Sequence, residues 1–307
     1  MSENIFDVAI VGSGPAGYSA SVYASRYNLR NVVFGKLPGG TISEAHKVCN
    51  YLAFEEITGL ELSDRFSSHA KNFGAEIQNK SVVDIKKMGD IFKIYTESDN
   101  IFEAKSVILA TGTKRKKLAI PDEDKYIGKG VSYCATCDSN FFKEKMVAVV
   151  GGSNAATTAA LLLSEVATHV YIIYRKDSLR GDQKWVEAVL QNKKIEVIYN
   201  TLVIGLKGNG KLEGITLDTE FNRGKLLKVD GLFIEIGSEP NGDLPLKLGL
   251  KTDEVGYIET EDDQSTNIEG IWAAGDMTTN SNRFQQVVTA VSEGAIAANS
   301  VYQYLKT

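Results

Sequence analysis

Two cysteines stand three positions apart in this sequence, and a carboxylate follows the second one directly. They are Cys134 and Cys137, and the acid is Asp138. This spacing lets a disulfide close across one turn of chain, so the pair can open and close without refolding. The attacking species in thiol exchange is the thiolate, and Asp138 is placed to exchange a proton with a leaving thiol. The stretch therefore predicts a redox-active dithiol with Asp138 as its acid/base.

Half of a zinc site has the same spacing, and this alternative stays open here. A zinc ion would need two further ligands, and the remaining candidates are Cys49, His46, His69 and His169. We favour the redox interpretation and expect no metal. Cys49 belongs to no motif, so we expect it to be a small buried hydrophobe.

A glycine-rich turn near the start of the chain follows a short apolar run at 6–11 and precedes a helical pattern at 18–27. In this context the spacing predicts a dinucleotide-binding turn that packs against a pyrophosphate, with the helix N-terminus facing the anion. The turn consists of Gly12, Ser13, Gly14, Pro15, Ala16 and Gly17. The acid expected about 20 residues further on to bind a ribose is absent, and Gly35 and Lys36 stand there instead.

A second turn of this kind follows the apolar run at 146–150. It begins Gly151-Gly152, but Ser153 takes the place of the second motif glycine, where its side chain could crowd a pyrophosphate or donate a hydrogen bond to it. Cations follow the next strand, at Arg175, Lys176 and Arg180. They suit a 2′-phosphate, which indicates NADP rather than NAD; the alternative is a solvated charged loop.

Composition narrows the remaining function classes. The chain has 307 residues, 43% of them hydrophobic, and a net charge of −5, so we expect about two domains and no nucleic-acid or membrane partner. Three cysteines argue against a secreted disulfide framework. No secretory signal or membrane-length apolar run is visible, so we expect a cytoplasmic protein.

The strand–turn–helix pattern occurs twice, which predicts an α/β protein of two similar halves, the second inserted into the first. Expected strands lie at 6–11, 32–34, 76–84, 91–96, 106–110, 146–150, 169–174, 195–199, 214–217, 232–236 and 270–276. Expected helices lie at 18–27, 63–73, 154–166 and 285–305.

On these motifs the sequence resembles the low-molecular-weight thioredoxin reductase family of FAD-containing disulfide reductases, over nearly the whole chain. The matching stretches are 10–18, 110–112, 133–138 and 273–276. The resemblance implies two Rossmann-like three-layer nucleotide-binding domains in a homodimer. The FAD domain would comprise 1–117 and 243–307, and the pyridine-nucleotide domain with the dithiol would comprise 118–242.

The resemblance also implies roles for individual residues. Cys137 would meet the flavin and Cys134 would attack the disulfide of thioredoxin. Residues expected to contact FAD are Gly12, Ser13, Gly14, Pro15, Ala16, Gly17, Gly39, Gly40, Asn50, Thr111, Gly112, Gly275, Asp276, Gln285, Gln286 and Val287. Those expected to contact NADPH are Gly151, Ser153, Asn154, Ala155, Arg175, Lys176 and Arg180.

Departures from the family pattern gather in the nucleotide contacts. Besides Ser153, Tyr174 stands where the family has histidine, Gln285 where it has arginine, and 157–159 carry no acids. We expect a thioredoxin reductase that uses NADPH and FAD. The alternatives are the same dithiol chemistry with a donor such as reduced ferredoxin, a flavin-dependent dithiol oxidase, and a zinc-stabilised nucleotide-binding regulator.

Overall fold

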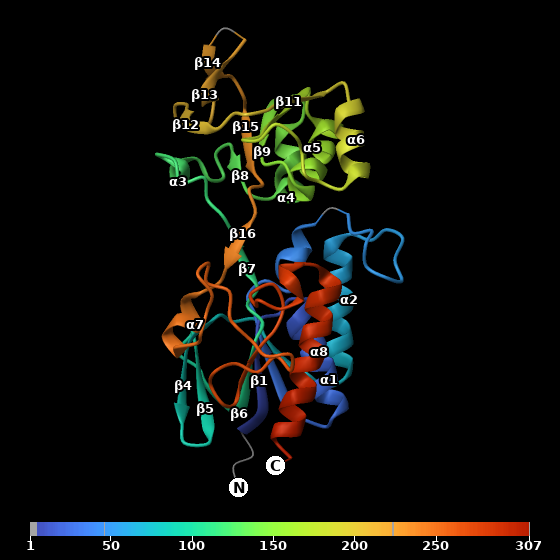
Figure 1. The fold of residues 1–307 in the computed structure, drawn as a ribbon, viewed down its shortest axis with the longest axis vertical. Helices are drawn as coiled ribbons and strands as arrows, with labels where there is room; N and C mark the ends of the chain where they lie inside the picture. Colours follow the sequence, from blue (N-terminus) through green and yellow to red (C-terminus); the bar gives the residue numbers. More distant parts are fainter. Residues whose placement is uncertain (1–4, 46, 223, 307) are drawn as a thin grey trace. The chain divides into compact units, whose positions relative to one another are not determined.

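The computed structural model describes residues 5–45, 47–222 and 224–306, and the chain forms two compact units (Figure 1). Unit 1 joins Met1–Lys114 to Glu239–Thr307, and unit 2 is Arg115–Ser238. Unit 2 is thus one continuous stretch, whereas unit 1 is assembled from both ends of the chain. The unit limits lie three and four residues before the domain limits expected at 117 and 242.

Unit 1 is built on a parallel sheet that is extended by an antiparallel hairpin. Its parallel strands are, in spatial order, β3 (Glu76–Gln78), β2 (Asn31–Phe34), β1 (Ile5–Val11), β6 (Ile101–Leu109) and β17 (Ile271–Ala273). The long strand β6 joins the parallel sheet to the antiparallel hairpin. Its second half pairs with β17, while its first half pairs antiparallel with β5 (Ile91–Thr96), which pairs in turn with β4 (Val82–Met88).

Three layers result because side chains alternate across strand β1. Val8 and Ile10 face a core that includes α1 (Pro15–Arg26) and α8 (Val287–Tyr304), and α2 (Gly59–Asn72) lies beside them (Figure 1). Ala9 and Val11 face the opposite core, which takes in residues of the β4–β5 hairpin and of α7 (Asp243–Leu248).

Unit 2 repeats the plan with a second parallel sheet. Its strands are, in spatial order, β11 (Ile195–Ile198), β10 (His169–Ile173), β9 (Met146–Val150), β15 (Gly231–Ile234) and β8 (Val131–Ser132). The core on one face includes residues of α5 (Asn154–Val166) and α6 (Gln183–Gln191). The core on the other face includes residues of the antiparallel strands β12 (Val203–Lys207), β13 (Gly214–Phe221) and β14 (Gly224–Leu227).

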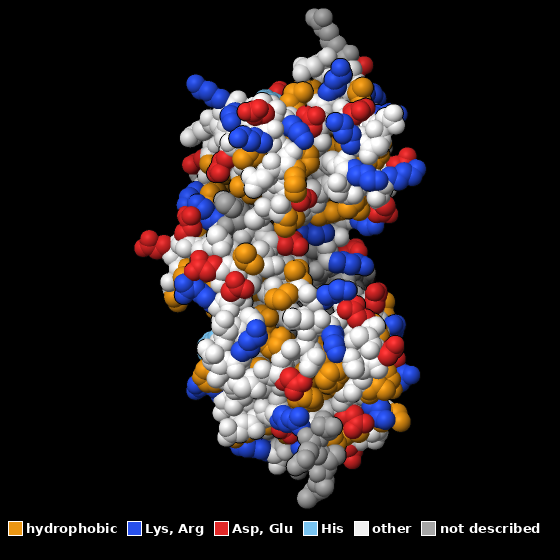
Figure 2. Space-filling model, turned by 180° about the vertical axis from the view of Figure 1, so that it is seen from behind, with side chains coloured by type: hydrophobic (Ala, Val, Ile, Leu, Met, Phe, Trp, Pro, Cys, Tyr) orange, Lys and Arg blue, Asp and Glu red, His pale blue; other side chains and the backbone are white. Residues whose placement is uncertain are grey.

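Short elements complete the two units. They are η1 (Gly40–Glu44), β7 (Thr113–Arg115), α3 (Glu123–Tyr126), α4 (Ala135–Asp138), η2 (Ser139–Phe142), β16 (Ser238–Pro240) and η3 (Ser281–Arg283). Basic and acidic side chains are intermixed over the face drawn in Figure 2. Within the described ranges no helix has the length and apolarity needed to cross a membrane.

The expected α/β fold with two Rossmann-like three-layer halves is confirmed. One expected strand is wrong: 76–84 is two strands, because the chain turns at Lys80, whose amide donates to the Gln78 carbonyl at 2.8 Å, before β4 begins. Helix α6 and strands β12 and β14 were not predicted. These elements are only nine, five and four residues long, so their hydrophobic patterns are weak.

Candidate functional site

The glycines of the first turn divide into two kinds. Gly12 has φ +129°, and a Cβ there would lie 2.0 Å from the Ala110 carbonyl oxygen. A Cβ on Gly17 would lie 1.8 Å from the Gly12 oxygen. Gly14 has φ −84°, and its Cβ would meet only the Gly39 oxygen, at 3.8 Å. Gly12 and Gly17 are therefore required for packing, whereas Gly14 leaves open space at the start of α1.

The loop around Gly39 and Gly40 packs against this turn. The Gly39 amide donates to the Ser13 carbonyl at 2.8 Å, and the Ser13 hydroxyl donates to the Leu37 carbonyl at 2.9 Å. A Cβ on Gly35 would lie 2.0 Å from the Ser13 hydroxyl oxygen. Ser13 thus occupies the space beside Gly35, which accounts for a glycine in the region where the sequence pattern leads one to expect a ribose-binding acid.

The segment after β17 reaches the same helix start from the other end of the chain. A Cβ on Gly275 would lie 2.9 Å from the Ala16 Cβ, and one on Gly294 would lie 2.1 Å from the Ala16 oxygen. The amide and hydroxyl of Thr111 donate to the Met277 sulfur at 3.2 and 3.3 Å. The structure therefore brings together the first glycine turn, Thr111 and the Gly275–Asp276 turn.

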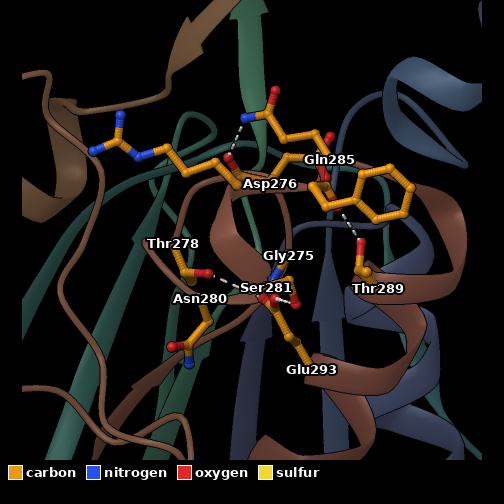
Figure 3. Close-up of a pocket in the computed structure, with 10 residues that line it drawn as sticks. Gly275, Asp276, Thr278, Asn280, Ser281, Gln285, Thr289 and Glu293 are labelled. Carbon is orange, nitrogen blue, oxygen red and sulfur yellow. Dashed lines mark hydrogen bonds between the residues drawn. The ribbon is translucent and has the colours of Figure 1, made fainter.

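A buried acid that the sequence analysis missed holds this segment. Glu293 of α8 is 4% exposed. It accepts hydrogen bonds from the Gly275 amide (2.7 Å), the Thr278 hydroxyl (3.0 Å) and the Ser281 hydroxyl (2.6 Å). These residues and Asp276 line a pocket (Figure 3). A lone acid among the small residues of the last helix is the signal that could have revealed Glu293.

Asp276 is an acid with an unusually high pKa. Burial, and secondarily the negative charge of Glu293, raise its pKa from 3.8 to about 6. Between these values Asp276 keeps a proton in the folded protein that it has released in the unfolded chain. The contribution of Asp276 to stability is therefore fully present below pH 3.8 and is lost as pH rises to about 6.

We therefore expect Asp276→Asn to flatten the fall in stability of the flavin-free protein over this pH range. The contribution amounts to roughly 3 kcal/mol. Urea unfolding of the wild type and the variant at pH 4, 5, 6 and 7 measures it, with Asp64→Asn on the exposed face of α2 as control. Parallel stability curves for wild type and Asp276→Asn would contradict the assignment.

The remaining expected flavin contacts converge at the start of α8. The Asn50 side-chain amide donates to the Gln286 side-chain oxygen at 2.8 Å. Gln285 donates to the Asp276 carbonyl at 3.0 Å and to the Tyr257 hydroxyl at 3.2 Å. Gln286 caps α8, and Val287 is its first residue and packs against the same small core as Tyr51. Gln285, which replaces an arginine of the family pattern, thus ties the two ends of the 276–285 segment together.

In unit 2 the ring of Tyr174 packs against the second glycine turn. Gly151 has φ +143°, and its Cβ would lie 2.2 Å from the Glu235 oxygen. A Cβ on Gly152 would lie 2.5 Å from the ring of Tyr174. Ser153 is the N-cap of α5, without a side-chain capping bond. Gly152 therefore leaves just enough room for the tyrosine that replaces the family's histidine.

The loop after β10 folds back onto this turn. The Arg180 amide donates to the Gly152 carbonyl at 2.6 Å, and its Nε donates to the Tyr174 hydroxyl at 2.8 Å. The Asn154 side chain accepts from the Asp182 amide at 2.6 Å, and Ala155 follows in the first turn of α5. The side chains of Arg175 and Lys176 are exposed. The three expected cations are thus on one loop beside the turn.

The dithiol, also in unit 2, is a disulfide in this structure. Cys134 and Cys137 are bonded, with their Cα atoms 5.4 Å apart. The Cys137 amide donates to the Cys134 sulfur at 3.1 Å, and the Cys134 amide donates to the Ser132 hydroxyl at 3.0 Å. Cys137 is exposed, while Cys134 and Asp138 are half-buried. The amide at the Cys134 sulfur would favour a thiolate there once the bond opens.

A second buried acid that was not predicted anchors the residue before Cys134. Glu123 accepts from the amides of Leu118 (3.1 Å) and Ala119 (2.8 Å) and from the Tyr133 hydroxyl. Burial, followed by the Glu123 carboxylate, raises the pKa of Tyr133. Tyr133 therefore stays a neutral hydrogen-bond donor. Through Glu123 it connects the residue before Cys134 to the Leu118–Ala119 backbone near the start of unit 2.

The zinc alternative gains no support. Among the described residues no group of three His, Cys, Asp or Glu side chains could hold a metal ion, and His46 lies outside those residues. The expectation that Cys49 is buried is wrong. Cys49 is exposed, beside Asn50, because its loop rests on the core through Val48 instead.

Comparisons with known proteins agree on one kind of relative. The family model for pyridine nucleotide-disulphide oxidoreductases matches residues 6–294. The chain is 41% identical to the thioredoxin reductase of Bacillus subtilis (strain 168) over 309 residues, which cover 99% of this chain and 96% of that protein.

Solved structures give the same result. Lactococcus lactis thioredoxin reductase in its FR conformation aligns with a TM-score of 0.92 and 35% identity, covering 98% of this chain and 99% of that one. A ferredoxin-flavin thioredoxin reductase from Clostridium acetobutylicum aligns with a TM-score of 0.53 and 34% identity, covering 98% and 99%.

Proposed function

The chain belongs to the pyridine nucleotide-disulphide oxidoreductase family, and within it to the low-molecular-weight thioredoxin reductases. From this premise we propose that it transfers electrons from NADPH through FAD and the Cys134–Cys137 pair to the disulfide of thioredoxin. The family implies FAD and a nicotinamide cofactor. The observation that carries the proposal is the Cys134–Cys137 disulfide, in a chain that also has two nucleotide-type turns.

The residues of unit 1 fit FAD. A Cβ on Gly14 would fill the space at the start of α1 where a pyrophosphate would lie. Gly39 and Gly40 would flank it, and Asp276 would bind the ribityl or phosphate region. When bound, FAD supplies a two-electron relay between nicotinamide and dithiol. Asn50 and Gln286, already hydrogen-bonded to each other, would contact the flavin.

At the dithiol, the reduction of thioredoxin takes two thiol–disulfide exchange steps. The Cys134 thiolate attacks the thioredoxin disulfide, forming a mixed disulfide and releasing one thioredoxin thiolate. The Cys137 thiolate then attacks the Cys134 sulfur, which closes the protein's disulfide and releases the second thiolate. Asp138 would supply a proton to a leaving thiolate. The amide of Cys137 supports Cys134 as the attacking group, because it stabilises negative charge on that sulfur.

For the electron donor we propose NADPH, bound with its 2′-phosphate at Arg175, Lys176 and Arg180. The double variant Arg175→Ala/Lys176→Ala should raise the KM for NADPH about tenfold or more, since hydrogen bonds to charged groups are lost. The KM for NADH should stay the same. Steady-state kinetics measure both, with Lys184→Ala in α6 as a cation control outside the loop. Equal effects on the two nucleotides would contradict the 2′-phosphate assignment.

A ferredoxin-type donor is the second candidate, and one observation favours it. The Asn154 side-chain oxygen and the Arg180 Nε at the second turn are already engaged within unit 2, by Asp182 and Tyr174. Anaerobic flavin reduction by NADPH, NADH and reduced ferredoxin side by side decides the donor. Fast bleaching by NADPH supports the first candidate, and bleaching by ferredoxin alone supports the second.

We further propose that the protein is a cytoplasmic homodimer without nucleic-acid or membrane partners.

A further inference from the structure

The segment from Asp276 to Gln285 is a loop whose two ends are hydrogen-bonded to each other and which contains a turn with left-handed backbone angles. Its base is closed by Gln285, which donates to the Asp276 carbonyl at 3.0 Å. Inside it, Ser281, Asn282 and Arg283 have φ of 50°, 50° and 56°. Three consecutive non-glycine residues in the left-handed region cost conformational free energy. Surrounding contacts must therefore hold the 276–285 segment in this shape.

Glu293 provides three of these contacts from a single side chain. One carboxylate oxygen accepts from both the Gly275 amide and the Thr278 hydroxyl, and the other accepts from the Ser281 hydroxyl. Figure 3 shows Glu293 pointing from α8 toward these groups. Hydrogen bonds to an ionised acceptor are stronger than neutral ones, so Glu293 ties the start of the segment to its left-handed turn.

The position of Glu293 is itself fixed against the first glycine turn. The next residue, Gly294, is in such close contact with α1 that a Cβ on it would lie 2.1 Å from the Ala16 oxygen. Gly275 meets Ala16 as well. Gly275 and Gly294 thus both contact Ala16. The hydrogen bond between the Glu293 carboxylate and the Gly275 amide therefore holds Asp276, the next residue, at a fixed position relative to the N-terminus of α1.

We propose that Glu293 is a positioning residue: its side chain holds Asp276 and the 276–285 segment in the arrangement that binds FAD. The inference rests on the proposed function, because it takes FAD as the ligand of this site. An apolar side chain at 293 would leave the Gly275 amide and two hydroxyls without an acceptor. The left-handed turn would then relax, and Asp276 would no longer be held at the start of α1.

The test is the dissociation constant of FAD for flavin-free protein, measured by quenching of flavin fluorescence. We expect Glu293→Ala to raise this constant at least about tenfold. Glu293→Gln should recover most of the affinity, since its oxygen can accept from Gly275 and Thr278 while the Ser281 hydroxyl turns to accept from its amide. Val301→Ala, at a fully buried position on the same helix, is the matched control. It should lower the melting temperature but change the constant less than about twofold.

Three outcomes are informative. Glu293→Ala binding FAD as tightly as wild type, while wild type itself binds it, overturns the positioning role and leaves the proposed function intact. Wild type that binds no FAD overturns both. If Glu293→Ala does not fold, the double variant Thr278→Ala/Ser281→Ala removes two of the three contacts without altering α8. Unchanged affinity in that variant likewise overturns the proposal.

Discussion

Replacing either cysteine of the pair by serine lowers the kcat/KM for thioredoxin reduction by roughly 1,000-fold or more, as removal of a nucleophile does, while the donor still reduces the flavin. Each thiol is needed for one of the two exchange steps, so neither variant can complete a cycle. Insulin turbidity with thioredoxin measures the first effect, and anaerobic stopped-flow absorbance measures the second.

The two variants should differ in their partial reactions. Cys137→Ser keeps the Cys134 thiol, so it should trap a stable mixed disulfide with thioredoxin, visible on a non-reducing gel. Cys134→Ser should not trap one, and its remaining Cys137 thiolate should perturb the flavin absorption at long wavelength. Cys49→Ser is the matched control, because Cys49 is the other cysteine of the chain and is exposed. Trapping by Cys134→Ser in place of Cys137→Ser would reverse the assigned roles.

The second large effect separates two glycines that stand two residues apart. Gly12→Ala should destabilise the protein by roughly 3 kcal/mol or more, because left-handed backbone strain adds to a 2.0 Å contact with the Ala110 oxygen. Gly14→Ala meets no such contact and has an ordinary φ, so it should fold with a nearly unchanged melting temperature. It should nevertheless lose FAD, because its methyl group would occupy the space of the pyrophosphate.

Flavin content and thermal unfolding of the flavin-free proteins measure both effects together. The expected pattern is a stable but colourless Gly14→Ala and an unstable Gly12→Ala. Each variant acts as the control for the other, since both add one methyl group to the same turn. A yellow Gly14→Ala with wild-type flavin content would show that the cofactor does not approach this glycine.

Features that depend on neighbouring residues could be predicted from the sequence. The two turns and the helices after them follow from glycine spacing beside an apolar run, and helix 154–166 appears with the expected bounds. The dithiol is equally local, because its two sulfurs lie within one turn of chain.

Features that depend on distant contacts could not be predicted. Glu293 acquires its function from Gly275, Thr278 and Ser281, and Glu123 acquires its function from Tyr133, pairs that only the folded chain brings together. The exposure of Cys49 likewise depends on how its loop packs, which composition does not indicate. For Glu293 the available signal was a lone acid among small residues, but that pattern does not say which donors it meets. Glu123 stands between Asp122 and Asp124, where nothing in the sequence marks it as buried.

The place of strand β17 has a consequence for biosynthesis. Unit 2 is continuous, so it can fold as soon as residue 238 has left the ribosome. The first segment of unit 1 is made before unit 2, but unit 1 cannot be completed then, because Val107–Leu109 of β6 remains an open sheet edge until Ile271–Ala273 emerges. The inserted unit should therefore mature before the one that surrounds it. The first glycine turn gains its contacts with Gly275 and Gly294 only when these residues reach Ala16. The proposed FAD site should therefore be among the last parts of the nascent protein to form.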